Sequence, residues 1–160
     1  MITNQNLLNE YISTKKMVKS DLSIPTILDR IVQECIRVII EPICGARFYP
    51  HSYRFRPYRS QKHAIRDIVN VINASYKSKD QPVWALEGDI KCCFDNINHR
   101  ILLKKLLGIG VHDKRIIQII KAMLSVGYIE YDMLKNDDKG TPQGGILSPL
   151  LANVYLNDFD

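Results

Sequence analysis

An acidic side chain at the end of an apolar segment is the first candidate for chemistry in this sequence. The segment PVWALEGDI, residues 82–90, is predicted to be a β-strand because it is rich in β-forming residues and begins at a proline. Asp89 lies at its C-terminal end, where a carboxylate can reach a cleft, and the carbonyl of Ile90 follows. Hard oxygen ligands of this kind suit Mg²⁺, which assists phosphoryl transfer. The alternative is a turn aspartate that accepts backbone N–H bonds, the commoner role for an isolated residue.

The next residues, KCCFDNINH, have structural interpretations beside functional ones. Phe94 either packs in the core or forms the wall of a nucleotide pocket. Asp95 is well placed to cap the helix that follows, and capping is its favoured role. We expect His99 to be structural, and we expect Cys92 and Cys93 to be small packed residues rather than metal ligands.

The stretch GTPQGG is a second candidate site. Gly140, Gly144 and Gly145 permit positive φ or close approach of the backbone to a ligand, and Pro142 stiffens the loop. Gln143 then presents a single amide on a rigid turn ahead of a helix, where it can contact a base or a sugar. A glycine-rich turn is a weak signal by itself, so an ordinary tight turn is the alternative.

An arginine-rich loop at residues 47–60, RFYPHSYRFRPYRS, is the third candidate. It fits neither helical nor strand periodicity, and aromatic residues are interleaved with its arginines, Arg47, Arg54, Arg56 and Arg59. Guanidinium groups bind phosphates and aromatic rings stack on bases, so phosphate binding is favoured over a solvated surface loop. Arg30 lies in the preceding helix, where pairing with a neighbour such as Glu34 is favoured over a phosphate contact.

The composition sets broad limits on these interpretations. The 160 residues are 46% hydrophobic, which is enough for one domain with its own core. A formal charge of +5 suits a polyanionic partner without requiring one. No apolar run approaches the ~20 residues that cross a bilayer, so no membrane association is expected. The four cysteines show neither C-x-x-C spacing nor a disulfide framework, which favours a reduced, cytoplasmic setting.

The hydrophobic pattern predicts the helices that must position the candidate residues. Apolar residues recur with helical spacing over residues 24–43, where Thr26 can cap the helix and Gly45 can close it. In the last helix Ser148 is the predicted N-cap and Pro149 the first helical residue. Further helices are expected at about 61–77, 99–107 and 113–125.

A strand that runs into a polar turn is expected within residues 126–141. The predicted fold class is therefore α+β and helix-rich. Residues 1–23 form a polar, basic N-terminal segment, and residues 24–160 form a single folding unit.

Taken together and in this order, four stretches resemble the reverse transcriptases encoded by group II introns. The stretches are IPTILDRIVQ, SYRFRPYRS, EGDIKCCFDNINH and GTPQGGILSPLLANVYLNDFD. The resemblance covers about residues 24–160, and four matching blocks in the right order are far more specific than any one block. The resemblance favours the metal-ligand interpretation of Asp89 over the turn interpretation.

The resemblance implies a right-hand polymerase, of which this chain would form helix-rich fingers and the first half of the palm. Asp89 would be the first catalytic aspartate, and the Ile90 carbonyl would share its metal in a complete site with two Mg²⁺ ions. Phe94 would lie under the incoming sugar and disfavour a 2′-hydroxyl. The other implied contacts are Pro142, Gln143 and Gly144 with the nucleotide or template–primer, and Arg30, Arg54, Arg56 and Arg59 with nucleic acid.

The implied activity is RNA-directed DNA polymerisation, with an RNA template, a DNA primer, deoxynucleoside triphosphates and intron RNA as partners. The sequence departs from the family pattern at Arg54 and at Cys92, where glycine is usual. The Tyr-x-Asp-Asp motif that supplies two further carboxylates is absent from these 160 residues. We therefore expect the chain to be inactive alone. The alternatives are a non-catalytic RNA-binding module that uses the arginine loop, and self-association through the incomplete palm.

Overall fold

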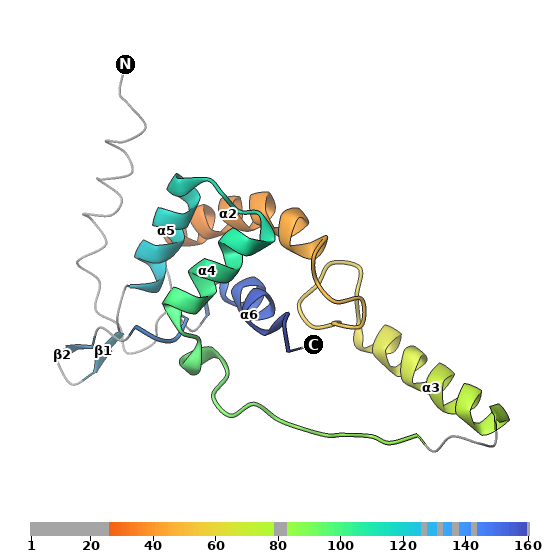
Figure 1. Ribbon diagram of the computed structural model, residues 1–160. Helices are drawn as coiled ribbons and strands as arrows, with labels where there is room; N and C mark the ends of the chain where they lie inside the picture. The colour runs from red at the N-terminus through yellow and green to blue at the C-terminus, as the bar shows by residue number, and fades with distance from the viewer. Residues whose placement is uncertain are drawn as a thin grey trace.

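The computed structural model describes residues 26–78, 83–125, 128–130, 133–135, 138–141 and 144–159. Helices dominate this part of the chain (Figure 1). The elements are α2 Ile27–Gly45, α3 Gln61–Ser78, the 3₁₀ helix η1 Phe94–Asn96, α4 His99–Ile109, α5 Lys114–Leu124, β1 Tyr128–Glu130, β2 Met133–Lys135 and α6 Ser148–Leu156. The helix-rich prediction is confirmed, and the predicted segment 1–23 lies outside the described residues.

Helix α2 begins where the sequence predicts. The Thr26 hydroxyl accepts a hydrogen bond from the Asp29 N–H at 3.2 Å and satisfies one of the free donors of the first turn. The buried residues of α2 include Ile36, Ile40 and Cys44, which recur at helical spacing and so face the core together.

The core lies where α2, α4, α5 and α6 come together, as Figure 1 shows. Its fully buried side chains come from all four helices and from the segment between η1 and α4, and they are Ile40, Cys44, Ile97, Leu102, Leu106, Ile120 and Val154. The apolar stripe predicted for the last helix is also buried, at Leu147, Leu150, Leu151 and Val154. Removal of this apolar surface from water holds the short helices together.

Two predicted helix caps are wrong. Asn98, not Asp95, caps α4: its side-chain oxygen accepts from the Ile101 N–H at 3.0 Å, while Asp95 lies within η1. Helix α4 begins at His99, as the pattern predicts, but η1 occupies residues 94–96 and leaves Asn98 as the residue directly before the helix. In α6, Ser148 is the first helical residue and Leu147 occupies the cap position.

Helix α3 projects away from the other helices (Figure 1). Its apolar face is exposed to solvent at Ile65, Ile68, Val69, Ile72 and Tyr76. The helical spacing was therefore predicted correctly, but no other part of the described chain buries this face.

The predicted strand at residues 82–90 is wrong for the part that the structure describes. Residues 83–90 are exposed and have no strand partner (Figure 1). A strand requires a neighbour to pair its backbone groups, and the described residues provide none here. The strand expected within 126–141 is instead an antiparallel pair of strands whose backbone register places Ile129 opposite Leu134. The α+β class therefore stays a prediction, since the described strands are only these two short ones.

Candidate nucleotide and nucleic-acid site

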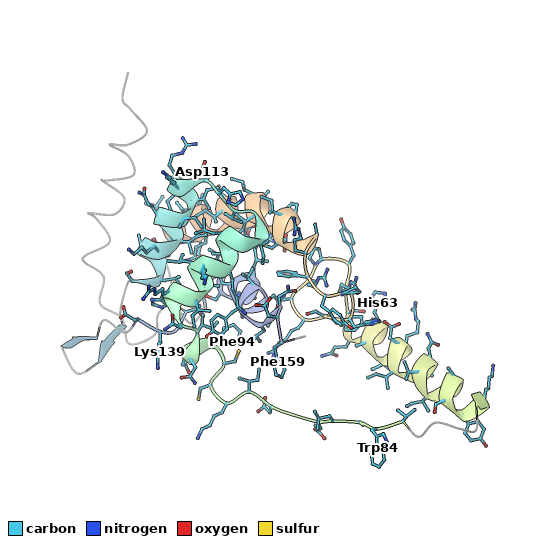
Figure 2. The ribbon with its side chains drawn as sticks, viewed as in Figure 1. His63, Trp84, Phe94, Asp113, Lys139 and Phe159 are labelled. Carbon is cyan, nitrogen blue, oxygen red and sulfur yellow. The ribbon has the colours of Figure 1, made fainter. Side chains whose placement is uncertain are left out.

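Two blocks that are far apart in the sequence, FDNINH and GTPQGG, meet in the structure. Backbone hydrogen bonds join them, from the Gly140 N–H to the Ile97 carbonyl (2.8 Å), from the Thr141 N–H to the Phe94 carbonyl (3.0 Å) and from the His99 N–H to the Asp138 carbonyl (3.1 Å). Figure 2 shows Phe94 and Lys139 near this contact. We call the contact between residues 94–99 and 138–141 the block junction.

Gly140 and His99 fix the block junction. The backbone of Gly140 has φ of +91°, and a Cβ atom there would lie 3.3 Å from the Asp95 carbonyl oxygen. His99 is buried, and its Nε2 lies 2.6 Å from the Gly140 carbonyl oxygen. Because a carbonyl can only accept, the Nε2–H of His99 is the donor. His99 thus has a structural role, as the sequence predicted.

Phe94 packs as its structural interpretation predicts, and its contact with a nucleotide sugar stays a prediction. Its side chain is partly buried and packs against the core, while its carbonyl accepts from the GTPQGG block. The structure therefore brings the predicted sugar-contacting residue beside the predicted nucleotide loop. Within that loop Gly144 is exposed with φ of +79°, as a glycine turn requires, whereas Pro142 and Gln143 lie outside the described residues.

Asp89 and Ile90 lie on the extended segment that precedes the block junction. Both are exposed, Ile90 at 44%. A carboxylate and a backbone carbonyl are oxygen ligands of the kind that Mg²⁺ prefers. No group of three or more potential metal-ligating side chains occurs among the described residues, so the metal-ligand role of Asp89 stays a prediction.

The arginine loop is held together by two of its own arginines. Arg56 donates to the carbonyls of Tyr49 (2.7 Å), Ser52 (3.0 Å) and Gly45 (3.2 Å), and Arg59 donates to the Pro50 carbonyl. Their guanidinium groups also lie over the rings of Phe48 and Tyr53. These two predicted nucleic-acid ligands are therefore partly buried and committed to the loop.

Arg54 and Arg30 are more accessible than Arg56 and Arg59. Arg54 is exposed, and its guanidinium lies 4.8 Å from the centre of the exposed Phe55 ring. Arg30 is exposed on α2. The predicted pair of Arg30 with Glu34 is wrong, because Glu34 accepts two hydrogen bonds from Arg37. Arg37 reaches Glu41 as well, so it bridges carboxylates one turn away on each side.

An open hollow of about 430 Å³ lies beside the loop. Its lining is mostly aromatic and aliphatic, with one acid and one base: Glu41, Pro42, Gly45, Phe48, Phe55, Arg56, Pro57, Tyr58 and Leu150. Tyr58 is 99% exposed. Flat apolar walls beside a guanidinium are suited to stacking of a base.

Two asparagines, one within α6 and one at its C-cap, dock the arginine loop, a contact that the sequence did not predict. The Asn157 side chain accepts from the Tyr49 N–H at 3.0 Å, and the Asn153 side chain donates to the Arg54 carbonyl at 2.7 Å. The signal was present in the sequence, since residues four apart lie on one face of a helix. Their loop partners are distant in sequence and could not be inferred from it.

Cys92 is exposed and Cys93 is partly buried, so the prediction that both are packed is wrong for Cys92. Cys92 has φ of +50°, a left-handed backbone conformation that a glycine adopts without strain. This geometry agrees with the family pattern, in which glycine is usual at this position.

The chain belongs to the reverse transcriptase family. Residues 13–160 match the family model described as reverse transcriptase (RNA-dependent DNA polymerase).

Proteins that are similar in sequence indicate which kind of reverse transcriptase this chain resembles. Group II intron-encoded protein LtrA of Lactococcus lactis subsp. cremoris is 41% identical over 151 residues, which are 94% of this chain and 24% of LtrA. Protein YkfC of Escherichia coli is 37% identical over 139 residues, 87% of this chain and 36% of YkfC. An uncharacterized 91 kDa protein in the cob intron of Schizosaccharomyces pombe is 41% identical over 142 residues, 89% of this chain and 17% of that protein. The predicted resemblance to group II intron-encoded proteins is confirmed, and the chain spans about a quarter of LtrA.

In the part of the chain that the structure describes, every helix is too short or too polar to cross a membrane.

Proposed function

We propose that this chain forms the fingers and the first half of the palm of an RNA-directed DNA polymerase of the group II intron type. The observation that carries the proposal is the family match over residues 13–160. The block junction supports it, because two motifs of the proposed nucleotide site are hydrogen-bonded to each other. The domain division into residues 1–23 and 24–160, the α+β fold class and a cytoplasmic location belong to this proposal.

The proposed reaction is attack of a primer 3′-hydroxyl on the α-phosphate of a deoxynucleoside triphosphate, with pyrophosphate as the leaving group. Asp89 and the Ile90 carbonyl would hold Mg²⁺, which supplies charge stabilisation at the phosphate when two ions are bound. Phe94 would contact the sugar of the incoming nucleotide and disfavour a 2′-hydroxyl. Pro142, Gln143 and Gly144 would contact the nucleotide or the template–primer.

The proposed partners are an RNA template, a DNA primer and deoxynucleoside triphosphates, with intron RNA as a further partner. The names of the intron-encoded relatives support the last of these. Arg30 and Arg54 are the exposed members of the proposed nucleic-acid ligands. Arg56 and Arg59 would act mainly by stabilising the arginine loop, which carries the exposed Arg54.

The isolated 160-residue chain is expected not to extend a primer, since one candidate catalytic aspartate stands where the family uses three. Fusion of a downstream palm segment that carries Tyr-x-Asp-Asp, taken from a reverse transcriptase of the family, should give template-dependent extension. Asp89→Asn in the fusion should abolish extension. Glu87→Gln is the matched control, because Glu87 is an exposed carboxylate on the same segment. Extension by the isolated chain, or a fusion that tolerates Asp89→Asn, would contradict the proposal.

The exposed rings of the arginine loop favour a second candidate, a non-catalytic RNA-binding module. In that case single-stranded RNA should bind in a salt-sensitive manner, unaffected by Asp89→Asn. Tyr58→Ala and Arg54→Ala should weaken binding by roughly tenfold, given ~1–3 kcal/mol per stacked base. These two variants are better tests than changes at Arg56 or Arg59, which would also disturb the loop. Unchanged affinity in both variants would exclude this candidate.

A further inference from the structure

Adjacent cysteines occupy a rigid turn immediately before η1. The Cys92 carbonyl accepts hydrogen bonds from the backbone N–H groups of Asp95 and Asn96, both at 3.1 Å. The Asn96 side-chain amide donates to the same carbonyl at 3.1 Å. The backbone that carries the two thiols is therefore fixed by several contacts, even though Cys92 has φ of +50°.

The thiols of this turn differ from the buried thiol of Cys44. Cys92 is exposed and Cys93 is partly exposed, while Cys44 is buried in the core. Burial raises the pKa of the Cys44 thiol to about 11, which keeps it protonated and unreactive. Cys35 is exposed on α2 but has no neighbouring cysteine in the sequence.

A disulfide is a poor product for adjacent cysteines. Successive Cα atoms across a trans peptide are ~3.8 Å apart. The usual Cα separation in a disulfide is roughly 4.4–6.8 Å. The peptide bond between Cys92 and Cys93 is trans, as are all those in the described chain. A single bridging atom between the sulfurs gives a ring one atom larger than a disulfide would, and so relieves this strain.

We propose that Cys92 and Cys93 form a chelating dithiol site for a soft, thiophilic centre, with trivalent arsenic as the ligand class. Thiolates are the protein ligands that soft centres prefer. With an organoarsenic oxide, two As–S bonds form and the As–O bond breaks. The two thiol protons leave with the oxygen as water, and arsenic remains trivalent. The site lies between Ile90 and Phe94, but its binding does not depend on the proposed polymerase function.

The test uses the 160-residue chain and phenylarsine oxide, with intact-mass spectrometry as the readout. One equivalent should bind and should remain bound in excess glutathione, because a monothiol cannot easily displace a chelated centre. Dithiothreitol, a dithiol, should remove it. An adduct on Cys35 alone should be lost in glutathione.

Variants assign the adduct to the turn. Cys92→Gly should lose the glutathione-resistant adduct. Glycine adopts the left-handed backbone of this position without strain, so the fold should be preserved. Cys93→Ser should lose the adduct as well, whereas Cys35→Ser should retain it. Helical circular dichroism checks that each variant is folded. Three results would overturn the proposal. The glutathione-resistant adduct could still form in Cys92→Gly or Cys93→Ser, it could be lost in Cys35→Ser, or it could be absent from the unaltered chain.

Discussion

Gly140 lies at the block junction with φ of +91°, and a Cβ atom there would approach the Asp95 carbonyl oxygen to 3.3 Å. Gly140→Ala should therefore lower the free energy of unfolding by about 1–2 kcal/mol, the cost of a left-handed residue with a Cβ. Urea denaturation would measure the change, with an unaltered slope expected.

Gly108 is the matched control for this prediction. It is exposed within α4, and a Cβ atom there would meet nothing within 4 Å. Gly108→Ala should raise the free energy of unfolding by roughly 0.5–1 kcal/mol, because alanine favours the helix. If both alanine variants shift stability in the same direction, the block junction does not constrain Gly140 as described.

Single residues also show what the sequence could and could not reveal. Thr26 was predicted as a helix cap because a cap depends on neighbours within one turn. Asp95 is the wrong cap because it lies within the 3₁₀ helix η1, and Asn98, directly before His99, takes the role. The hydrogen bonds of Arg56 to backbone carbonyls could not be predicted, because only the folded loop, which no periodicity describes, brings these partners together.

In the arginine loop, Arg56 stabilises the fold through hydrogen bonds, whereas Arg54 is exposed. Arg56 donates to carbonyls of the loop and of α2, so Arg56→Ala would remove three hydrogen bonds, of which those to Ser52 and Gly45 are partly buried. The free energy of unfolding should fall by about 2 kcal/mol, as for hydrogen bonds from a charged group. Arg54→Ala should cost less than about 1 kcal/mol, since it removes an exposed cation–π contact. Thermal or urea denaturation that gives equal losses would contradict this division.

Helix α5 provides a pH-dependent test. Asp113 caps it by accepting from the Arg115 N–H at 2.8 Å. Hydrogen bonds from the Arg115 side chain, and then from its backbone, hold the pKa of the Asp113 carboxyl at about 2. An aspartate in the unfolded chain has a pKa of about 3.9. The charged cap therefore stabilises the folded state above about pH 4, and its contribution is lost as the pH falls towards about 2.

Asp113→Ala should consequently lower the thermal midpoint at neutral pH, and the deficit should shrink as the pH falls below about 4. Asp113→Asn keeps a capping oxygen without the charge. Its deficit at neutral pH should be smaller than that of the alanine variant. Denaturation scans between neutral pH and about pH 2 would measure both. A deficit for Asp113→Ala that does not change with pH would show that ionisation of this carboxyl is not linked to folding.

For the whole molecule, the sequence predicts elements that depend on neighbouring residues but not contacts between segments that are distant in the sequence. The helices were predicted because their spacing is a property of consecutive residues. The segment at 83–90 has the composition of a strand, but strand pairing depends on a second segment that the described chain does not supply. The block junction likewise joins residues that only the folded chain brings together, although the shared family motifs indicated that they cooperate.

The exposed apolar face of α3 leads to a prediction for the isolated chain. Ile68 and Ile72 are 59% and 50% exposed on a helix that projects from the core (Figure 1). Contiguous exposed apolar surface and an unpaired extended segment both favour association between molecules. Sedimentation velocity should therefore show the 160-residue chain associating as its concentration rises.

Ile68→Glu combined with Ile72→Glu should shift the chain towards monomer, because charges on the contact face would be buried against each other. Asn70→Glu with Ala74→Glu is the matched control, since it adds the same charge to exposed positions on the opposite face of α3. The control should associate nearly as the unaltered chain does. If the unaltered chain stays monomeric at high concentration, this face does not mediate association. If both double variants dissociate the chain equally, added charge is the cause, and the apolar face of α3 is not the contact.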